Sequence, residues 1–226
     1  MQPVKPKKYL AFATCAALLG SVAVSSHAED IYAGIGFPGL VLGYSAPLIL
    51  QGQQSDFALR AEYAGGVTLS QTITRNGTDY TASWKANRVG GFVDWFPLSG
   101  TFRVSGGITL NETKGTLTGS GGANATINGK PVNLSGESFN MTLRYPTAMP
   151  YLGIGWGHER GAKKGFGFFA DIGVQFGKPN VDVQSSLVGK FGITQADIDA
   201  EADSARRRAN KLGVLPSAML GMTYTF

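Results

Sequence analysis

The chain has 226 residues, enough for one barrel or sandwich domain or for two small domains. Glycine accounts for 32 of them, about twice the usual share of roughly 7%, and charged residues make up only 15%, against a typical ~25%. This composition argues against a water-soluble α/β enzyme. It favours a sheet protein whose outer surface does not face water.

Residues 1–28 have the features of a secretory signal peptide. Three lysines near the start are followed by the mostly apolar run 9–24 and by the small residues of Ser26-His27-Ala28. We therefore expect residues 29–226 to form the mature chain. Three of the 20 basic residues leave with the signal, so 17 remain against 15 acidic ones. The formal net charge of +5 therefore does not indicate a nucleic-acid partner.

The only cysteine, Cys15, lies in this segment, so the mature chain cannot form disulfides. A lipoprotein anchored through Cys15 is the alternative, and the apolar residues 16–19 beyond the cysteine argue against it. No later segment approaches the ~20 apolar residues of a spanning helix. If the mature protein enters a membrane, we expect a closed barrel, because only helices and closed barrels pair every backbone group in hydrocarbon.

The last segment of the chain alternates between apolar and polar residues, with a period of two that is typical of a strand. Thr223 and Thr225 lie on one face of this predicted strand, and Met219 is the exception to the alternation. The opposite face carries Ala218, Leu220, Met222, Tyr224 and Phe226.

Seven strands of this kind are expected, and a shorter eighth gives the even count that is usual for single-chain bacterial barrels. The seven cover residues 40–48, 56–72, 79–96, 101–117, 143–157, 165–177 and 214–226, and the eighth is Ile31–Gly36. The sequence therefore predicts an all-β fold, a transmembrane antiparallel up-and-down barrel of eight strands with one short extracellular helix. A ten-stranded wall is the alternative if residues 125–132 extend it.

Short and long links alternate between these strands. Outer-membrane barrels have short periplasmic turns and longer extracellular loops, so the polar residues 118–141 and 178–212 are the expected extracellular loops. Asn76-Gly77 and Asn128-Gly129 are strong signals for tight hairpins. We expect the second hairpin to stand above the barrel rim.

One helix is expected within residues 178–212, with Thr194 as its cap. Acidic residues fill its first half and basic residues its second half, as the helix dipole favours. Its apolar stripe is narrow, so a solvated helix resting on the rim is the first interpretation. A plug folded into the barrel mouth, or a helix whose arginines contact lipopolysaccharide phosphates, is the alternative.

Charged residues recur on the strand faces that point away from lipid. Isolated buried charges are very costly, so these groups need water or each other. The first interpretation is a salt-bridge network that fills the lumen, because an eight-stranded barrel is just wide enough for its side chains. Inward glycines at 90, 107, 153, 155, 167 and 173 leave space, which keeps a narrow polar pore or a small-ligand pocket as the alternative. The lumen charges are Arg60, Glu62, Arg88, Asp94, Arg103 and Asp171.

Signals for catalysis, cofactors and metals are weak. Gly34 to Gly39 matches a dinucleotide-binding pattern, but Pro38 interrupts it and a predicted strand follows instead of a helix. His158 is the only histidine of the mature chain, and we expect it to be a polar residue of a periplasmic turn, with no serine clearly beside it. One histidine and no cysteine do not make a metal site. We therefore predict no enzyme, no catalytic residue, no cofactor and no metal.

Aromatic residues lie near the predicted strand ends, where those that face outward suit girdles at the membrane interfaces. They are Trp84, Trp95, Tyr151, Trp156 and Tyr224.

Several segments resemble a group of small proteobacterial outer-membrane proteins: Asp94–Gly107, Pro150–Gly157, Phe168–Val174 and Tyr224-Thr225-Phe226. The architecture is similar to the transmembrane domain of outer membrane protein A. The terminal pattern also resembles the signal read by the barrel-assembly machinery. This resemblance implies that the signal is carried by Leu220, Met222, Tyr224 and Phe226. Deletion of Phe226 is expected to lower the amount of protein in the outer membrane, and normal insertion would contradict this.

These observations predict an integral protein of the bacterial outer membrane with a structural or surface-interaction role and a charge-filled lumen. A narrow channel or carrier for small solutes is the alternative, and a membrane-embedded lipid-modifying enzyme that uses His158 is less favoured. The expected partners are outer-membrane lipids and lipopolysaccharide. During biogenesis, periplasmic chaperones and the barrel-assembly machinery are expected partners as well.

Overall fold

The computed structural model describes residues 29–75, 78–98, 100–120, 125–158 and 164–226. The predicted signal peptide and the Asn76-Gly77 turn lie outside these residues. The elements are β1 (Asp30–Phe37), β2 (Gly39–Leu50), β3 (Gln53–Arg75), β4 (Thr78–Trp95), β5 (Phe102–Ser120), β6 (Ala125–Ile127), β7 (Lys130–Val132), β8 (Ser138–Arg144), β9 (Ala148–Trp156), β10 (Gly165–Phe176), β11 (Asn180–Ser185), α1 (Gln195–Ala209) and β12 (Val214–Thr225).

Eight of these strands close into a barrel. The strands β1 to β5 pair in chain order, β9 pairs with β5, β10 with β9 and β12 with β10, and β12 returns to β1. All of these pairs are antiparallel, so the predicted eight-stranded up-and-down barrel is confirmed. In the described part of the chain, no helix is both long and apolar enough to cross a membrane.

The alternation of residues along each strand places apolar side chains on the outside of the barrel. All eight strands contribute exposed apolar residues, and we call this surface the apolar belt. It includes Ile31, Ile35, Leu40, Leu42, Phe57, Leu59, Val89, Val93, Ile108, Leu110, Leu152, Ile154, Phe168, Ile172, Leu220 and Met222.

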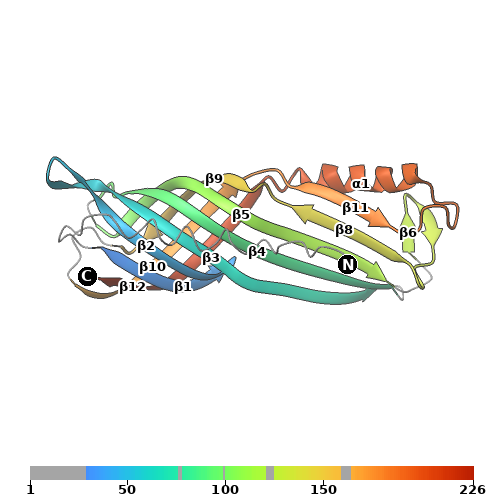
Figure 1. The fold of residues 1–226 in the computed structure, drawn as a ribbon, viewed down its shortest axis with the longest axis horizontal. Helices are drawn as coiled ribbons and strands as arrows, with labels where there is room; N and C mark the ends of the chain where they lie inside the picture. Colours follow the sequence, from blue (N-terminus) through green and yellow to red (C-terminus); the bar gives the residue numbers. More distant parts are fainter. Residues whose placement is uncertain (1–28, 76–77, 99, 121–124, 159–163) are drawn as a thin grey trace, which may run out of the picture.

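Three strands continue beyond the barrel and form the base of a five-stranded part of the same sheet. The first part of β4 pairs with the last part of β3 and with the last part of β5, β8 joins β5, and β11 joins β8. We call this part of the sheet, together with the hairpin β6–β7 and α1, the extension. Figure 1 shows β8, β11, β6 and α1 at the end of the elongated molecule that lies away from the C-terminus.

The extension corrects three expectations. Residues 118–141 and 178–212 contain more than the expected hairpin and helix, because most of β8 and all of β11 also lie in them. The predicted strand 143–157 is two strands, β8 and β9, which pair with different stretches of β5. The hairpin forms as expected from Asn128-Gly129, but it makes a separate sheet, so the ten-stranded wall is wrong.

The polarity of the sheet reverses where the barrel gives way to the extension. In β4, the outward side chains are apolar at Val93 and Val89 and change to the exposed Lys85. The inward side chains change in the opposite sense, from the charged Arg88 to the buried Ala86. An apolar outer face suits hydrocarbon and a polar outer face suits water, so the reversal marks a boundary between two environments.

A β-bulge produces the same reversal in β3. Ala64 pairs with Arg88 of β4 and Val67 pairs with Ala86, so β3 carries one residue more than its partner between these pairs. Gly65 makes this possible, because its φ is +151° and a Cβ there would lie 2.8 Å from the Ala86 carbonyl oxygen. The apolar side chains of β3 therefore turn from the outer face to the inner face.

The helix begins where the sequence predicts. Thr194 and Asp197 form a capping box, in which each side chain accepts a hydrogen bond from the backbone N–H of the other residue. Ile198 is buried with apolar residues of the hairpin and of the segment that precedes the helix. The helix packs on β11 and β6, so it lies along the extension and not on the barrel rim or inside the barrel mouth.

Candidate functional site

The barrel interior contains the six charged residues that alternation places on its inner face. Each of the six side chains is at most 2% exposed. Three cations and three anions give this cluster a net charge of zero. Its members are Arg60 and Glu62 from β3, Arg88 and Asp94 from β4, Arg103 from β5 and Asp171 from β10.

Arg60 lies at the centre of the cluster and touches all three acids. Its Nη1 is 2.8 Å from Glu62 Oε2, its Nε is 2.8 Å from Asp94 Oδ2, and its Nη1 is 3.7 Å from Asp171 Oδ2. The guanidinium also lies over the Phe92 ring, 4.4 Å from its centroid. A planar guanidinium with five donors suits this central position better than a lysine ammonium would.

The other two arginines extend the cluster in opposite directions. Arg88 Nη2 is 2.5 Å from Glu62 Oε1, and Arg103 Nη2 is 2.5 Å from Asp171 Oδ1. Tyr32 Oη donates a hydrogen bond of 3.0 Å to Glu62 Oε2. Charge-assisted hydrogen bonds of this kind are stronger than neutral ones, so the network ties β1, β3, β4, β5 and β10 together.

The inward glycines do not leave open space beside these charges, and that expectation is wrong. A Cβ placed on any of the six would meet a neighbouring side chain at 2.8 Å or less. Larger side chains therefore already occupy the room that the glycines provide. They are Phe92 beside Gly90 and Gly107, Tyr151 beside Gly153 and Gly173, Asp171 beside Gly155, and Thr223 beside Gly167.

His158 follows β9 in a turn, as expected, but it is buried and has specific partners. Its Nδ1 lies 3.1 Å from Asp30 Oδ2, and its ring packs edge-on against Tyr32 with centroids 4.6 Å apart. Thr225 Oγ1 donates a hydrogen bond of 2.6 Å to the other oxygen of Asp30. Through His158, these contacts join the end of β9 to the first and last strands of the barrel.

The sequence reasoning missed Asp30 and Tyr32, although a signal for both was present. Ile31 and Ala33 alternate with them along β1, and their exposed side chains place Asp30 and Tyr32 on the inner face. The apolar residues of this short strand are enough to predict it, whereas the partners of Asp30 and Tyr32 come from distant parts of the chain.

The residues expected to carry the assembly signal lie on the outer face of β12, except Phe226, which directly follows the strand. Leu220, Met222 and Phe226 are exposed, and the Tyr224 ring packs at 5.0 Å from the Phe166 ring of β10.

The expected girdle residues divide between two environments. Trp95 and Trp156 are exposed where β4 and β9 end. Tyr151 faces the barrel interior, where it is buried. Trp84 lies on the inner face of the extension and contacts the Tyr145 ring edge-on.

No cofactor or metal arrangement emerges from these contacts. Gly34 and Gly39 lie in β1 and β2, so the glycine cluster is part of two strands and their turn, as expected. Within the described ranges, no group of three or more His, Cys, Asp or Glu side chains is placed to hold a metal ion.

The fold is similar to that of two solved structures from Acinetobacter baumannii. CarO2 gives a TM-score of 0.62 at 20% identity, over 88% of this chain and 99% of its own. CarO gives a TM-score of 0.56 at 20% identity, over 87% of this chain and 97% of its own. No protein-family model and no curated relative matches the chain. The likeness shows that the fold is shared over most of the chain.

Proposed function

We propose that the chain is an integral outer-membrane barrel protein with a closed, charge-filled lumen and a structural or surface-contact role. The apolar belt supports the location, because all eight strands contribute to it and so extensive an apolar surface is unusual for a soluble monomer. An outward apolar band is what a barrel presents to hydrocarbon. The shared fold with the two Acinetobacter CarO structures agrees with this proposal.

The observation that carries the closed lumen is the pairing of its charges among themselves. Arg60 contacts Glu62, Asp94 and Asp171, and the aromatic side chains of Phe92 and Tyr151 occupy the space beside the inward glycines. A conducting pore needs a continuous water path through the lumen. A neutral, mutually paired cluster with filled gaps does not favour such a path.

A narrow channel is the second candidate, and one observation favours it. Arg88 Nε and Nη1 are buried and have no hydrogen-bond partner among the described residues. Buried polar groups of this kind are commonly satisfied by water. A chain of such waters past Arg88 is the route that a channel would use.

Single-channel recording in planar bilayers separates the two candidates. We expect no conductance steps from the folded wild-type barrel. Tyr151→Ala serves as the positive control, because it empties the space beside Gly153 and Gly173 and is expected to produce steps. Wild-type steps that disappear with Arg103→Glu would contradict the closed lumen and support the channel.

The surface-contact role rests on the extension, which stands on the side of the barrel away from the short turns. An epitope inserted between Asn128 and Gly129, at the tip of the hairpin, tests its exposure. Antibody labelling of intact cells is expected. Labelling only after the outer membrane is permeabilised would place the extension on the periplasmic side and refute the surface role.

A further inference from the structure

Three cations lie side by side on the outer face of the extension. The register pairs Lys85 of β4 directly with Lys114 of β5, and Lys114 directly with Arg144 of β8. We call these three residues the cationic row. Side chains that are directly opposite in an antiparallel pair have Cβ atoms about 4.5–5.5 Å apart, and like charges in these positions destabilise a sheet.

The charges nearby compensate this row only in part. Lys85 Nζ is 3.5 Å from Glu112 Oε2, and Arg144 Nη1 is 3.5 Å from Asp182 Oδ2. Lys114, the middle member, forms no ion pair with any residue that the structure describes, and it is exposed. Three cations therefore face two acids, and the central cation lies between two like charges.

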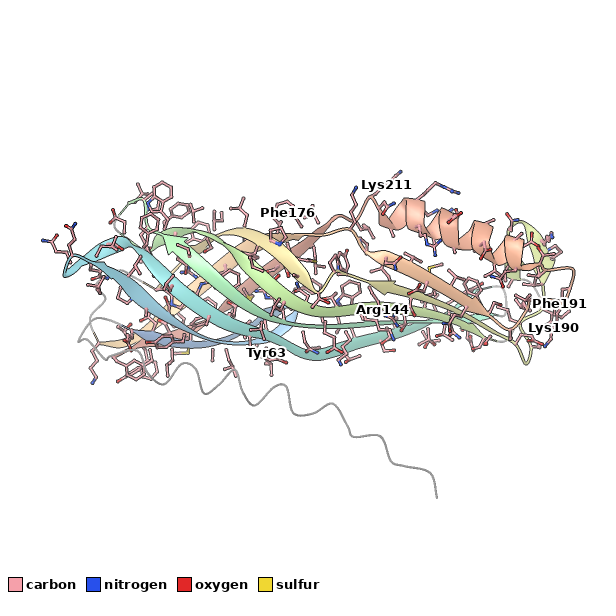
Figure 2. The ribbon with its side chains drawn as sticks, turned by 45° about the horizontal axis from the view of Figure 1, so that its top comes forward. Tyr63, Arg144, Phe176, Lys190, Phe191 and Lys211 are labelled. Atoms are coloured by element: carbon pink, nitrogen blue, oxygen red, sulfur yellow. The ribbon has the colours of Figure 1, made fainter. Side chains whose placement is uncertain are left out.

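The cationic row lies close to the apolar belt, and this position indicates where an anion for the row could come from. Lys85 and Lys114 lie four residues beyond the belt residues Val89 and Leu110 on the same outer faces. Four residues of a strand span about 13 Å, or about 10 Å along the membrane normal for a strand tilted by ~40°. The polar headgroup layer beside the hydrocarbon is roughly 5–7 Å thick, and long cationic side chains reach back several Å towards it. Figure 2 shows Arg144 part-way along the molecule, far from Lys190 at its tip.

We propose that the cationic row binds the phosphate of an anionic lipid headgroup in the leaflet next to the extension. This inference rests on the proposed outer-membrane location. A phosphate placed over Lys114 reaches all three cations and relieves their repulsion, while the acyl chains of the same lipid lie against the belt below. This combination distinguishes a lipid from a free anion.

The arginines near the end of α1 are a weaker candidate for the same ligand. Arg206 already donates to the Val181 carbonyl oxygen and to Asp203 Oδ1. Cations in the last turn of a helix are also stabilised by the helix dipole. The contacts of these arginines within the protein therefore account for their positive charge without a ligand. The contacts of the cationic row do not account for all three of its charges.

Titration with dihexanoyl-phosphatidylglycerol in zwitterionic micelles tests the proposal on the full-length folded barrel. Wild-type protein is expected to bind this lipid and not dihexanoyl-phosphatidylcholine. The variant Lys114→Gln/Arg144→Gln should bind about thirtyfold more weakly, since each cation near a lipid surface contributes a factor of about five to six. The affinity of wild type for phosphatidylglycerol should fall as the salt concentration is raised, and so should the ratio of the two affinities.

The matched control is Arg207→Gln/Arg208→Gln, which removes two exposed cations of the extension outside the row. It should bind within about twofold of wild type. Loss of binding in this control alone would assign the anion to the helix and overturn the proposal. Inorganic phosphate that binds as tightly as the lipid would show a free-anion site and overturn it as well.

A thermal measurement separates a ligand site from a purely structural role. Lys114→Gln removes the central repulsion, so in micelles without anionic lipid its melting temperature should equal or exceed that of wild type. In micelles that contain phosphatidylglycerol, wild type should instead have the higher melting temperature, because the lipid stabilises it more than the variant. If the same protein has the higher melting temperature with and without phosphatidylglycerol, the proposal is contradicted. The proposed outer-membrane location has its own test. A barrel that folds in these micelles and fractionates with the outer membrane supports that location, whatever the cationic row binds.

Discussion

Arg60 shows how one buried residue can hold several strands in register. Its guanidinium contacts acids from β3, β4 and β10, and the network includes no exposed charge. Removing one partner of such a network leaves the others charged and desolvated. Loss of a partner therefore has a larger effect than the net contribution of the intact pairs.

We expect Arg60→Met to lower the free energy of unfolding by ~3–5 kcal/mol, because Glu62, Asp94 and Asp171 lose their shared cation. Denaturant titration of the barrel in lipid vesicles measures this change. In zwitterionic vesicles, where no anionic lipid meets the cationic row, Arg144→Met is the control, since its exposed pair with Asp182 contributes ~1 kcal/mol or less. Equal unfolding free energies for Arg60→Met and wild type would show that the network does not stabilise the barrel.

At the scale of elements, two carboxylates of α1 join the hairpin to the helix: Asp197, and Glu201, whose Oε2 accepts a hydrogen bond of 3.3 Å from the Asn128 backbone N–H. Asp197 accepts hydrogen bonds from Lys130 Nζ at 2.7 Å and from Asn128 Nδ2 at 2.9 Å, while it also caps α1 through Thr194. The Lys130 ammonium, followed by the Thr194 N–H and the Asn128 amide, holds the pKa of this carboxyl well below its usual value. The hairpin and α1 are therefore linked through titratable groups, of which Asp197 makes the shorter contacts.

This lowered pKa predicts an acid-dependent loosening of the hairpin. A carboxyl whose folded pKa is depressed contributes stability that is fully present above its unfolded pKa of about 3.9 and is lost as the pH falls below it. Between pH 6 and pH 3, hydrogen exchange of the amides in residues 125–134, corrected for intrinsic rates, should therefore accelerate. Asp197→Asn should exchange faster at pH 6 already and change less with pH.

Asp199→Asn serves as the control, because Asp199 is exposed on the same helix and, among the residues that the structure describes, accepts a hydrogen bond only from Gln195. The amide exchange rates of Asp199→Asn should change with pH as those of wild type do. The pair between Lys190 and Glu137 also loses its stabilising effect on acidification, since hydrogen bonds from Lys190 and Ser186 lower the Glu137 pKa. Identical pH profiles for Asp197→Asn and wild type would assign the loosening to that pair.

At the scale of the whole molecule, the barrel depends on closure between its first and last strands. Gly34 and Gly221 are paired across this seam. A Cβ on Gly221 would lie 2.2 Å from the Ala33 carbonyl oxygen and 2.5 Å from the Phe169 ring. The backbone atom cannot move aside without opening the seam.

We expect Gly221→Val to lower the ratio of folded to unfolded chain after refolding by about tenfold, because overpacking against backbone costs ~1–3 kcal/mol. Gel electrophoresis of unheated samples measures it, since a closed barrel migrates differently from the unfolded chain. Gly91→Val is the matched control, because a Cβ there meets no atom within 4 Å and points outward from β4. Equal folded fractions for the two variants would contradict this account of the seam.

The sequence by itself determined the barrel and much of its local structure. Alternation along a strand is a local property with a period of two, so residues such as Phe57 and Arg60 could be assigned to opposite faces without knowing their neighbours. The helix cap at Thr194 and the hairpin at Asn128-Gly129 are equally local, since each depends on a few adjacent residues. These predictions hold in the structure.

Only the tertiary structure decided which groups meet. The contacts of Arg60 with Asp171 and of His158 with Asp30 depend on barrel closure, which brings together strands far apart in the chain. The extension depends in the same way on where β8 and β11 pair. The cationic row arises from this pairing, because register sets which side chains lie opposite one another and alternation sets only the face that each one occupies.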